Sequence, residues 1–226
     1  MYGVPAYIIV AIIGIETDYG RHMGDFPVLD ALSNIAFEHS DRSDFFQREL
    51  VQFLLLCREK NINPQKVLGS YAGAIGLPQF MPGTLRYYAV DFNHTGKIDI
   101  SHSAADAIGS VANFFRVLGW KTNQPILMHA QIKTKLQGKV KQKLEKNILE
   151  ANFTIAKLKQ YGIYPSHKIS TNKKVGFINV DANGNGYYIG FENLYVITHY
   201  NNSILYAMAA YQLGKEIEKA MKDNKD

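Results

Sequence analysis

The feature that most constrains this chain is an apolar run near its start that ends in a carboxylate. Residues 4–15 are almost entirely apolar, and Glu16 follows them directly. Pro5 suits the first turn of a helix and Gly20 suits the position after its end, so the run predicts a buried helix through Tyr19. It lacks the basic segment and cleavage site of a signal peptide and is too short to cross a bilayer. We therefore expect no signal peptide and no transmembrane segment in this chain.

Glu16 lies in the last turn of this predicted helix, on the same face as Ile9, Ile12 and Ile13. Removal from water and the negative end of the helix dipole would both raise the pKa of its carboxyl group. A glutamic acid that is protonated near neutral pH is what a general acid requires. A structural ion pair between Glu16 and Arg21 is the alternative that the residues leave open.

Three further helices follow from periodicity and capping. We expect one at residues 43–60, with Ser43 as N-cap, one at 104–118, and one from Asn202 or Ser203 to Lys222. The inward face of the first should carry Phe46, Leu50, Phe53 and Leu54. The lone Cys57 is expected to be buried and inert.

A glycine-rich segment, residues 70–84, separates the first two of these helices. Its glycines let backbone approach a ligand closely, and Gln79 offers both a donor and an acceptor. The glycine spacing matches neither of the common phosphate-binding loops. Pro82 and Gly83 indicate the start of another helix.

Residues 91–99 resemble the first part of a calcium-binding EF-hand loop. Side chains with oxygen fall at positions 1, 3, 5 and 9, and Gly96 stands at position 6. Position 12 is His102, where a bidentate acid would be usual.

Composition changes after Trp120. The following segment is rich in lysine, which favours anionic partners, but no arginine is interleaved and we expect no nucleic-acid site. Residues 175–180 and 187–190 predict two strands of a hairpin, joined by a turn at 181–186.

These motifs together resemble one known family. The matching segments are Gly14-Ile15-Glu16-Thr17, Gly20-Arg21, the 70–82 segment from Ser70 to Pro82, Ala89-Val90-Asp91-Phe92, the 106–113 segment from Asp106 to Asn113, and Tyr200-Asn201 with Ser203. In this order they are similar to the membrane-bound lytic murein transglycosylases of the B type, glycoside hydrolase family 103.

The resemblance implies an α+β fold that is mainly α, with a lysozyme-like helical core and a small β-containing inserted subdomain. We expect the core with its EF-hand-like loop at residues 1–120 and a lysine-rich α+β insertion at 121–188. Residues 189–226 would supply a cleft segment and a C-terminal helix that packs back on the core.

The resemblance also implies an activity. The β-1,4 bond between N-acetylmuramic acid and N-acetylglucosamine of peptidoglycan would be cleaved, and the muramyl C6 hydroxyl would close a 1,6-anhydro ring. Glu16 would be the one catalytic acid and base, and no cofactor would be required. A hydrolase normally needs a second carboxylate, and Asp18 lies about 200° round the helix from Glu16.

Position by position, the family pattern implies further site residues. The substrate-binding residues would be Arg42, Ser70, Gln79, Tyr200, Asn201 and Tyr206. A structural calcium ion would be held by Asp91, Asn93, Thr95, Lys97 through its carbonyl, and Asp106. One extra residue before Asp106, and Thr95 in place of an acid, predict weak binding.

Two alternatives remain beside a lytic transglycosylase. A muramidase would hydrolyse the same bond, and a weakly active form would only bind peptidoglycan. The second alternative arises because family members carry a long region before the catalytic acid, where this chain has fifteen residues. Glycan strands of peptidoglycan are the expected partner, and the periplasm or the outer membrane is the location inferred from that substrate.

Overall fold

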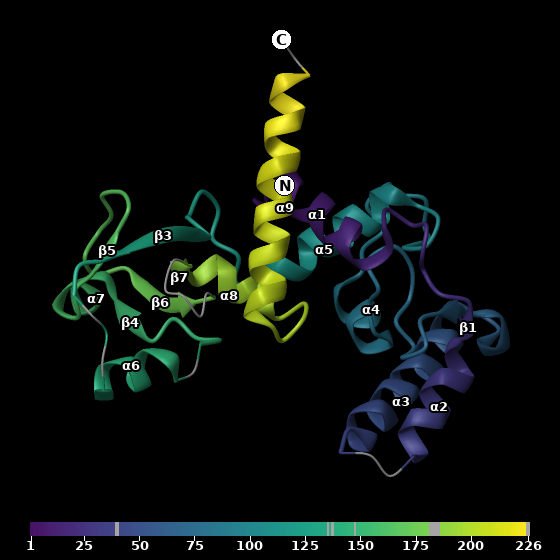
Figure 1. The fold of residues 1–226 in the computed structure, drawn as a ribbon. Coiled ribbons are helices and arrows are strands. Elements are labelled where there is room, and N and C mark those ends of the chain that lie inside the picture. The colour runs from purple at the N-terminus through teal and green to yellow at the C-terminus, as the bar shows by residue number, and fades with distance from the viewer. Residues whose placement is uncertain (39–40, 135, 137, 147, 181–185, 225–226) are drawn as a thin grey trace. The chain divides into compact units, whose positions relative to one another are not determined.

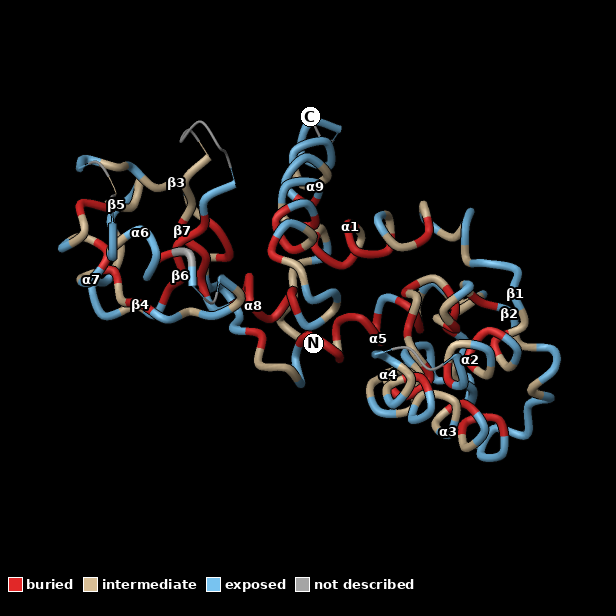
Figure 2. The backbone as a smooth tube through the Cα atoms, turned by 60° about the horizontal axis from the view of Figure 1, so that its bottom comes forward, coloured by how far each residue is buried: buried red, intermediate tan, exposed pale blue. Residues whose placement is uncertain are grey.

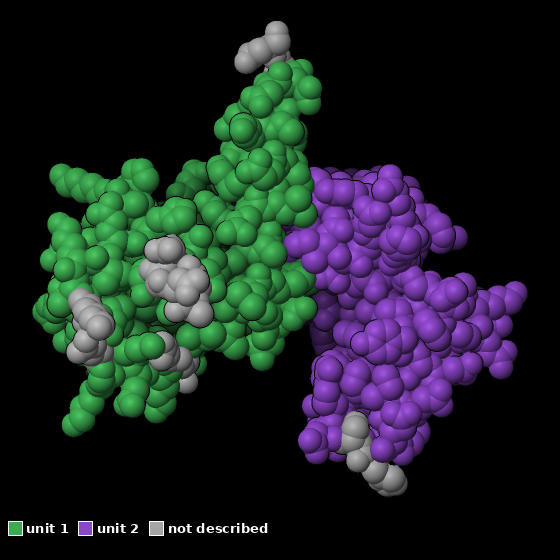
Figure 3. Space-filling view, in the orientation of Figure 1, with its two compact units in different colours: residues 1, 3, 118–226 green, residues 2, 4–117 purple. Residues whose placement is uncertain are grey.

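The chain divides into two compact units, each described here by itself (Figure 3). The computed structural model describes all residues except 39–40, 135, 137, 147, 181–185 and 225–226. Tyr2 and residues 4–117 form one unit, called the helical unit below, and residues 1, 3 and 118–226 form the other, called the sheet unit. The division lies three residues from the predicted end of the core at 120. The predicted three-part organisation as a whole stays a prediction.

The helical unit is built from five helices joined by short irregular segments (Figure 1). The helices are α1 (Ala6–Thr17), α2 (Val28–Phe37), α3 (Ser43–Lys60), α4 (Pro82–Tyr88) and α5 (Ala104–Val117). Two short antiparallel strands, β1 (Phe26–Pro27) and β2 (Leu68–Gly69), and the 3₁₀ turn η1 (Pro64–Lys66) lie between them. The helix predicted at Pro82 and Gly83 is confirmed, with Pro82 in its first turn.

Helix α1 buries one face, as its apolar composition predicts. Ile8 and Ile12 are fully buried, and half of the residues of the helix are in the buried class, which is red in Figure 2. The prediction that it runs through Tyr19 is wrong by two residues, because it ends at Thr17 and Asp18 adopts a left-handed conformation (φ 49°). After α1 the chain turns back, and the ring of Tyr19 occupies the space that a side chain at position 14 would need. The Cζ atom of Tyr19 lies 2.7 Å from the place of a Cβ on Gly14.

Helix α3 has the predicted bounds but a different inward face. Phe46 and Phe53 are buried as predicted, whereas Leu54 is 46% exposed. Cys57 is buried as predicted, and Leu56 takes the inward place expected of Leu54. The N-cap position belongs to Arg42 and not to Ser43.

The described residues of the sheet unit form one antiparallel sheet and four helices (Figure 1). The strand order is β4-β6-β7-β3-β5, and every pairing is antiparallel. The strands are β3 (Leu127–Ile132), β4 (Phe153–Thr154), β5 (Ile163–Pro165), β6 (Lys174–Asn179) and β7 (Tyr187–Phe191). The helices are α6 (Gly138–Glu145), α7 (Ile155–Gln160), α8 (Glu192–Thr198) and α9 (Ile204–Asp223). The predicted hairpin is confirmed as β6 and β7, while its turn at 181–185 lies outside the described residues.

One face of the sheet is covered by α6 and α7. Phe177 of β6 and Ile189 of β7 point to this face and pack with Leu144, Ile155 and Leu158 of the two helices. All five side chains are buried, so this layer is the hydrophobic core of the sheet unit.

Helix α8 covers part of the opposite face, where two glycines make room for it. The hydroxyl of Tyr195 lies only 1.8 Å from the place of a Cβ on Gly176, and 3.0 Å from that on Gly190. The two glycines are direct neighbours across β6 and β7. The Tyr195 hydroxyl is buried and makes no hydrogen bond within the described part of the chain, and burial raises the pKa of this side chain.

Helix α9 packs along its first half only. The helix was predicted from Asn202 or Ser203, and Ser203 is its N-cap; the Ser203 side chain accepts a hydrogen bond from the N–H of Tyr206 at 3.2 Å. Ala207, Met208 and Ala210 are buried, while almost every described residue from Lys215 onward is exposed or nearly so (Figure 2). Among the described residues, no helix is both long enough and apolar enough to cross a membrane.

The contact between Tyr195 and Gly176 yields a prediction about stability. Gly176→Ala should lower the free energy of unfolding by about 2 kcal/mol or more, because the new methyl group overlaps the tyrosine hydroxyl. Tyr195→Phe should be neutral or slightly stabilising, since it removes a buried hydroxyl without a partner. Urea unfolding of both variants and of the double variant measures this. The double variant should recover part of the loss, and a loss equal to that of Gly176→Ala alone would contradict the packing argument.

Candidate active site

Glu16 occupies the last turn of α1, as predicted. The Glu16 side chain is half-buried. Ile9, Ile12 and Ile13 precede it by seven, four and three residues, and all three are buried. The Glu16 carboxylate therefore belongs to the most apolar helix of the unit. It lies at the end of that helix, where the surface is partly accessible to water. The structure confirms the position of Glu16, and its protonation near neutral pH stays a prediction.

The next acidic residue along the chain, Asp18, forms an ion pair just after the end of α1. Asp18 takes the left-handed conformation, and its Oδ2 accepts a hydrogen bond from Nη1 of Arg21 at 3.0 Å. This ion pair is exposed, with 76% of the Arg21 side chain accessible to water. The charge of Asp18 is thus balanced by an arginine that the sequence left open as a partner for Glu16.

Thr17 ties the end of α1 to the glycine-rich loop. Its hydroxyl lies 3.2 Å from the carbonyl oxygen of Ile13 and 3.0 Å from that of Leu77, and it accepts the N–H of Gly20 at 3.0 Å. Thr17 is only 1% exposed, so these bonds form in a site that water does not reach. The residue directly after Glu16 therefore holds a loop sixty positions away.

The backbone after α1 makes two more contacts with this loop. An ideal Cβ on Gly24 would lie 2.2 Å from the carbonyl oxygen of Gly69 and 2.6 Å from the nitrogen of Ser70, so only glycine allows this approach. The side-chain amide of Gln79 donates to the carbonyl oxygen of Met23 at 3.0 Å. Ser70 and Gln79 are thus both attached to the segment that follows Glu16.

Ser70 and Gln79 keep part of their hydrogen-bonding capacity. The Ser70 oxygen accepts the N–H groups of Ala72 and Ala74 at 3.3 and 3.1 Å, which leaves its hydroxyl hydrogen to donate. The Gln79 nitrogen donates to Met23 and, at 3.0 Å, to Gly76, which leaves its carbonyl oxygen to accept. Gln79 also has a positive φ of 50°, a conformation that few non-glycine residues adopt. The loop therefore offers one donor and one acceptor in fixed positions.

Arg42 lies at the N-terminus of α3 and is exposed. Its guanidinium group lies 5.5 Å from the ring centroid of Phe45 and 5.1 Å from that of Phe46. These cation–π contacts orient the side chain without neutralising it. Its predicted role in substrate binding stays a prediction.

The other three predicted substrate-binding residues belong to the sheet unit, where α8 leads into α9. The rings of Tyr200 and Tyr206 are nearly parallel, with centroids 6.4 Å apart and planes inclined by 9°. Asn201 lies between them in the turn, and its carbonyl oxygen accepts the N–H of Ser203 at 2.6 Å. The structure brings these three residues together, and their approach to Glu16 stays a prediction.

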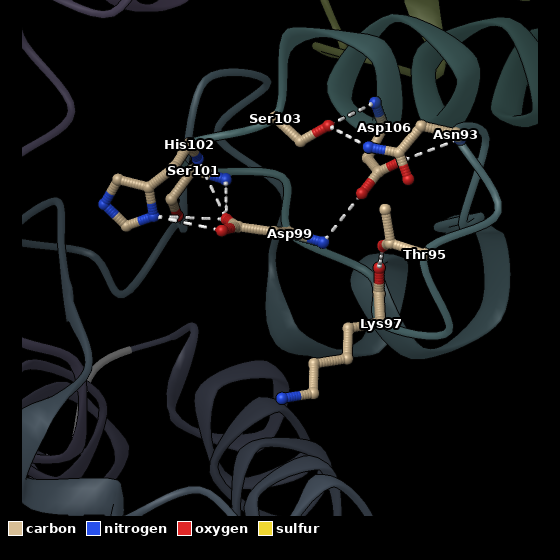
Figure 4. A network of polar contacts seen from close by, with 8 residues as sticks. All are labelled: Asn93, Thr95, Lys97, Asp99, Ser101, His102, Ser103 and Asp106. Carbon is tan, nitrogen blue, oxygen red and sulfur yellow. Dashed lines mark hydrogen bonds and ion pairs between the residues drawn. The ribbon is translucent and has the colours of Figure 1, made fainter.

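The predicted calcium loop is closed by its first residue (Figure 4 shows the loop around it). The carboxylate of Asp91 accepts the N–H groups of Thr95 at 3.0 Å and Gly96 at 2.7 Å. Burial of Asp91 opposes its ionisation, but these N–H groups outweigh it and hold the pKa below its ordinary value. The Thr95 hydroxyl lies 3.2 Å from the carbonyl oxygen of Lys97 and 3.5 Å from Oδ1 of Asp91. Oxygens of three predicted ligands therefore converge.

Asp106 is held differently from the other predicted ligands. It is 1% exposed, and its Oδ1 accepts the N–H groups of Phe92 at 2.9 Å and Asn93 at 3.3 Å, while Oδ2 accepts that of Asp99 at 3.0 Å (Figure 4). Each carboxylate oxygen has two lone pairs, so only Oδ2 keeps one for a metal ion. Within the described residues, no three His, Cys, Asp or Glu side chains are grouped as metal ligands.

Two features of this region escaped the sequence interpretation. Asp99 accepts the N–H groups of Ser101 and His102 at 3.0 and 2.9 Å and forms an ion pair with the His102 ring. Its place at position 9 of the EF-hand pattern was the sequence signal from which this role could have been predicted. A cavity of about 590 Å³ also lies beside the loop. Its walls combine loop residues such as Thr95 with apolar side chains such as Leu56, which no local pattern reveals.

Comparison with known proteins identifies similar chains over nearly the whole length. The family described as Transglycosylase SLT domain matches residues 1–215. Membrane-bound lytic murein transglycosylase B of Escherichia coli (strain K12) is 39% identical over 221 residues, which is 97% of this chain. The chain spans 59% of the length of that curated relative.

Solved structures agree with this result. The soluble lytic transglycosylase SltB1 from Pseudomonas aeruginosa is 44% identical, with a TM-score of 0.88 over 98% of this chain and 72% of its own. The Escherichia coli lytic transglycosylase Slt35, solved in complex with calcium, is 37% identical, with a TM-score of 0.82 over 97% of this chain and 68% of its own. The predicted fold class, mainly α with a small β-containing part and a lysozyme-like core, is confirmed.

The position of Thr17 yields a prediction. Thr17→Val should lower the free energy of unfolding by about 1–3 kcal/mol, because the N–H of Gly20 and the carbonyl oxygen of Leu77 lose a buried partner. Thr17→Ser keeps the hydroxyl and is the matched control, which should lose less. Chemical denaturation of both variants measures the difference. Equal losses would mean that the methyl group, and not the hydroxyl, holds the loop.

Proposed function

Since this chain belongs to the Transglycosylase SLT domain family, we propose that it is a lytic transglycosylase of peptidoglycan. The enzyme would cleave the β-1,4 bond between N-acetylmuramic acid and N-acetylglucosamine and leave a 1,6-anhydromuramyl end. Neither a metal ion nor another cofactor takes part in this reaction.

In this mechanism Glu16 acts twice. As a carboxylic acid, it gives its proton to the glycosidic oxygen while the bond from that oxygen to C1 of the muramyl residue breaks. As a carboxylate, it then takes the proton of the C6 hydroxyl while O6 forms a bond to C1. The proton that leaves Glu16 is thus replaced, and no water is consumed.

The observation that carries this proposal is the arrangement around the end of α1. Glu16 is half-buried beside a fixed loop that Thr17 and Gln79 attach to the same segment. The adjacent acid, Asp18, is paired with Arg21 on the surface. A hydrolase with two carboxylates needs the second one free to activate water or to attack C1. This arrangement supports a transglycosylase more than it supports a muramidase.

The remaining site residues would hold the sugar chain. The Ser70 hydroxyl and the Gln79 carbonyl oxygen supply a donor and an acceptor for sugar hydroxyl or N-acetyl groups. Tyr200, Asn201 and Tyr206 would hold the muramyl N-acetyl group and stabilise positive charge at C1, and Arg42 would pair with a carboxylate of the stem peptide.

The loop at residues 91–106 fits a calcium ion with few ligands. Asp91, Thr95 and the carbonyl oxygen of Lys97 converge, Asn93 adds an amide oxygen, and Asp106 adds one oxygen at most. With two carboxylates, one of them monodentate, the site should bind calcium weakly. The ion would stabilise the loop and leave the reaction to Glu16. The solved calcium complex of Slt35 supports this proposal.

The substrate also suggests a location. Peptidoglycan lies outside the cytoplasmic membrane, so we place the enzyme in the periplasm or at the outer membrane. Its partner there is the glycan strand of peptidoglycan, and nucleic acid is not a partner.

The one-carboxylate mechanism predicts opposite results for two neighbouring acids. Glu16→Gln should lower the rate of cleavage of purified peptidoglycan by at least about a hundredfold, because general acid catalysis contributes at least that much. Asp18→Asn should stay within about tenfold of the parent. Mass spectrometry of the released muropeptides should find 1,6-anhydro ends. Reducing ends, together with a collapse of activity in Asp18→Asn, would establish a two-carboxylate muramidase.

A second test concerns calcium. Millimolar Ca²⁺ should raise the thermal unfolding midpoint, because an ion that binds only the folded state stabilises it. Asp91→Asn should remove most of this rise by taking away the first ligand of the loop. Glu216→Gln removes an exposed acid of α9 and should respond to Ca²⁺ as the parent does. An unchanged rise in Asp91→Asn would place calcium elsewhere.

A further inference from the structure

Within the described residues of the sheet unit, no helix covers one part of the sheet on the face opposite α6 and α7. Strand register places His129 of β3 beside Tyr188 of β7, and Gln131 of β3 beside Tyr164 of β5. Because alternate residues of a strand share a face, Lys133, just beyond β3, extends the same row. His129, Gln131 and Lys133 are exposed, and both tyrosines are half-buried. We call these five residues the open face.

Helix α8 separates the open face from the covered end of the same sheet surface. Leu127 pairs with Gly190 one step earlier along β3, and there the side chains of Leu194 and Tyr195 lie against the sheet. Ile178, the cross-strand neighbour of Tyr188, is also buried. The open face therefore begins at the first residues of the sheet that α8 does not cover. The part of the sheet beside its rings is well packed.

The side chains of the open face form one aromatic pair and one cation–π pair. The rings of His129 and Tyr188 have centroids 4.6 Å apart and planes inclined by 36°. The ammonium group of Lys133 lies 4.8 Å from the ring centroid of Tyr164. Gln131 lies between the two pairs and can both donate and accept hydrogen bonds. From His129 to Lys133 the row extends about 13 Å at the usual rise of a strand, which is longer than a single sugar ring.

This combination matches the chemistry of an acidic glycan. Aromatic rings offer flat apolar faces on which the C–H groups of a sugar can pack, and an amide and an imidazole offer bonds to hydroxyl groups. The ammonium group of Lys133 places a positive charge on this face that complements a carboxylate.

We propose that the open face binds peptidoglycan glycan strands, with sugar faces on Tyr164 and Tyr188 and with Lys133 paired to a carboxylate of a lactyl group or stem peptide. The identity of the glycan rests on the proposed function, while the affinity for an acidic glycan rests on the open face alone. The surface belongs to the unit that does not carry Glu16, so it would hold the substrate by residues other than the catalytic acid.

The test measures binding to purified sacculi by sedimentation, in a Glu16→Gln background that leaves the sacculi intact. Tyr164→Ala combined with Tyr188→Ala should raise the Kd at least about tenfold, since each aromatic contact contributes roughly a factor of three or more. Lys133→Glu should also raise the Kd, but not for sacculi whose carboxylates have been amidated. Lys139→Glu, an exposed lysine of α6 on the covered side of the sheet, is the matched control and should stay within about twofold.

The outcomes separate this inference from the proposed function. A folded double-alanine variant that binds sacculi with the Kd of its parent overturns the inference. The inference is also overturned if Lys133→Glu and Lys139→Glu bind sacculi with the same Kd. Should the double-alanine variant fail to fold by circular dichroism, the lysine pair decides alone. If a single-stranded oligonucleotide of equal charge displaces the protein from sacculi, the open face is a nucleic-acid site and the inference is likewise overturned. A parent that never cleaves peptidoglycan, yet binds it through the open face, would refute only the proposed function.

Discussion

The fold of the helical unit depends on one buried hydroxyl. Thr17 stands where α1 ends, and its bonds to Leu77 and Gly20 connect the most apolar helix of the chain to a loop sixty residues later. Together with the close approach of Gly24 to Gly69 and the bond from Gln79 to Met23, this connection holds the glycine-rich loop at the end of the helix that carries Glu16. The donor of Ser70 and the acceptor of Gln79 are thereby fixed to the same piece of backbone, which is the preorganisation that an acid catalyst needs.

Local patterns were sufficient to predict the parts of the fold that local forces determine. The apolar run predicted α1, apolar periodicity predicted α9 from Asn202 or Ser203, and oxygen spacing predicted the loop closed by Asp91. The end of α1 and the exposed Leu54 were misjudged, because both depend on packing partners distant in sequence. The short strands β3, β4 and β5 were not foreseen either, since their pairing is decided by neighbours and not by composition.

The candidate site divides in the same way. Glu16, Ser70 and Gln79 were predicted from motifs. The structure connects their segments through hydrogen bonds of Thr17 and Met23 and the close approach of Gly24 to Gly69, which no spacing rule contains. Asp106 was predicted as a metal ligand, yet most of its oxygen capacity is used by backbone N–H groups. Tertiary context therefore changes what a correctly placed residue can do. The open face illustrates the reverse case, in which ordinary residues acquire a shared chemistry only after strands pair.

The bonds of Asp106 have a consequence for how the loop responds to an ion. Three amide groups from both ends of the loop already converge on this carboxylate, and Asp91 closes the turn between them. The backbone entropy of the loop is thus lost when the chain folds, before any cation arrives. An ion would then bind to a loop that is already formed, with a small heat-capacity change and little rearrangement of neighbouring helices. The loop would therefore stabilise the structure and would not act as a sensor of ion concentration.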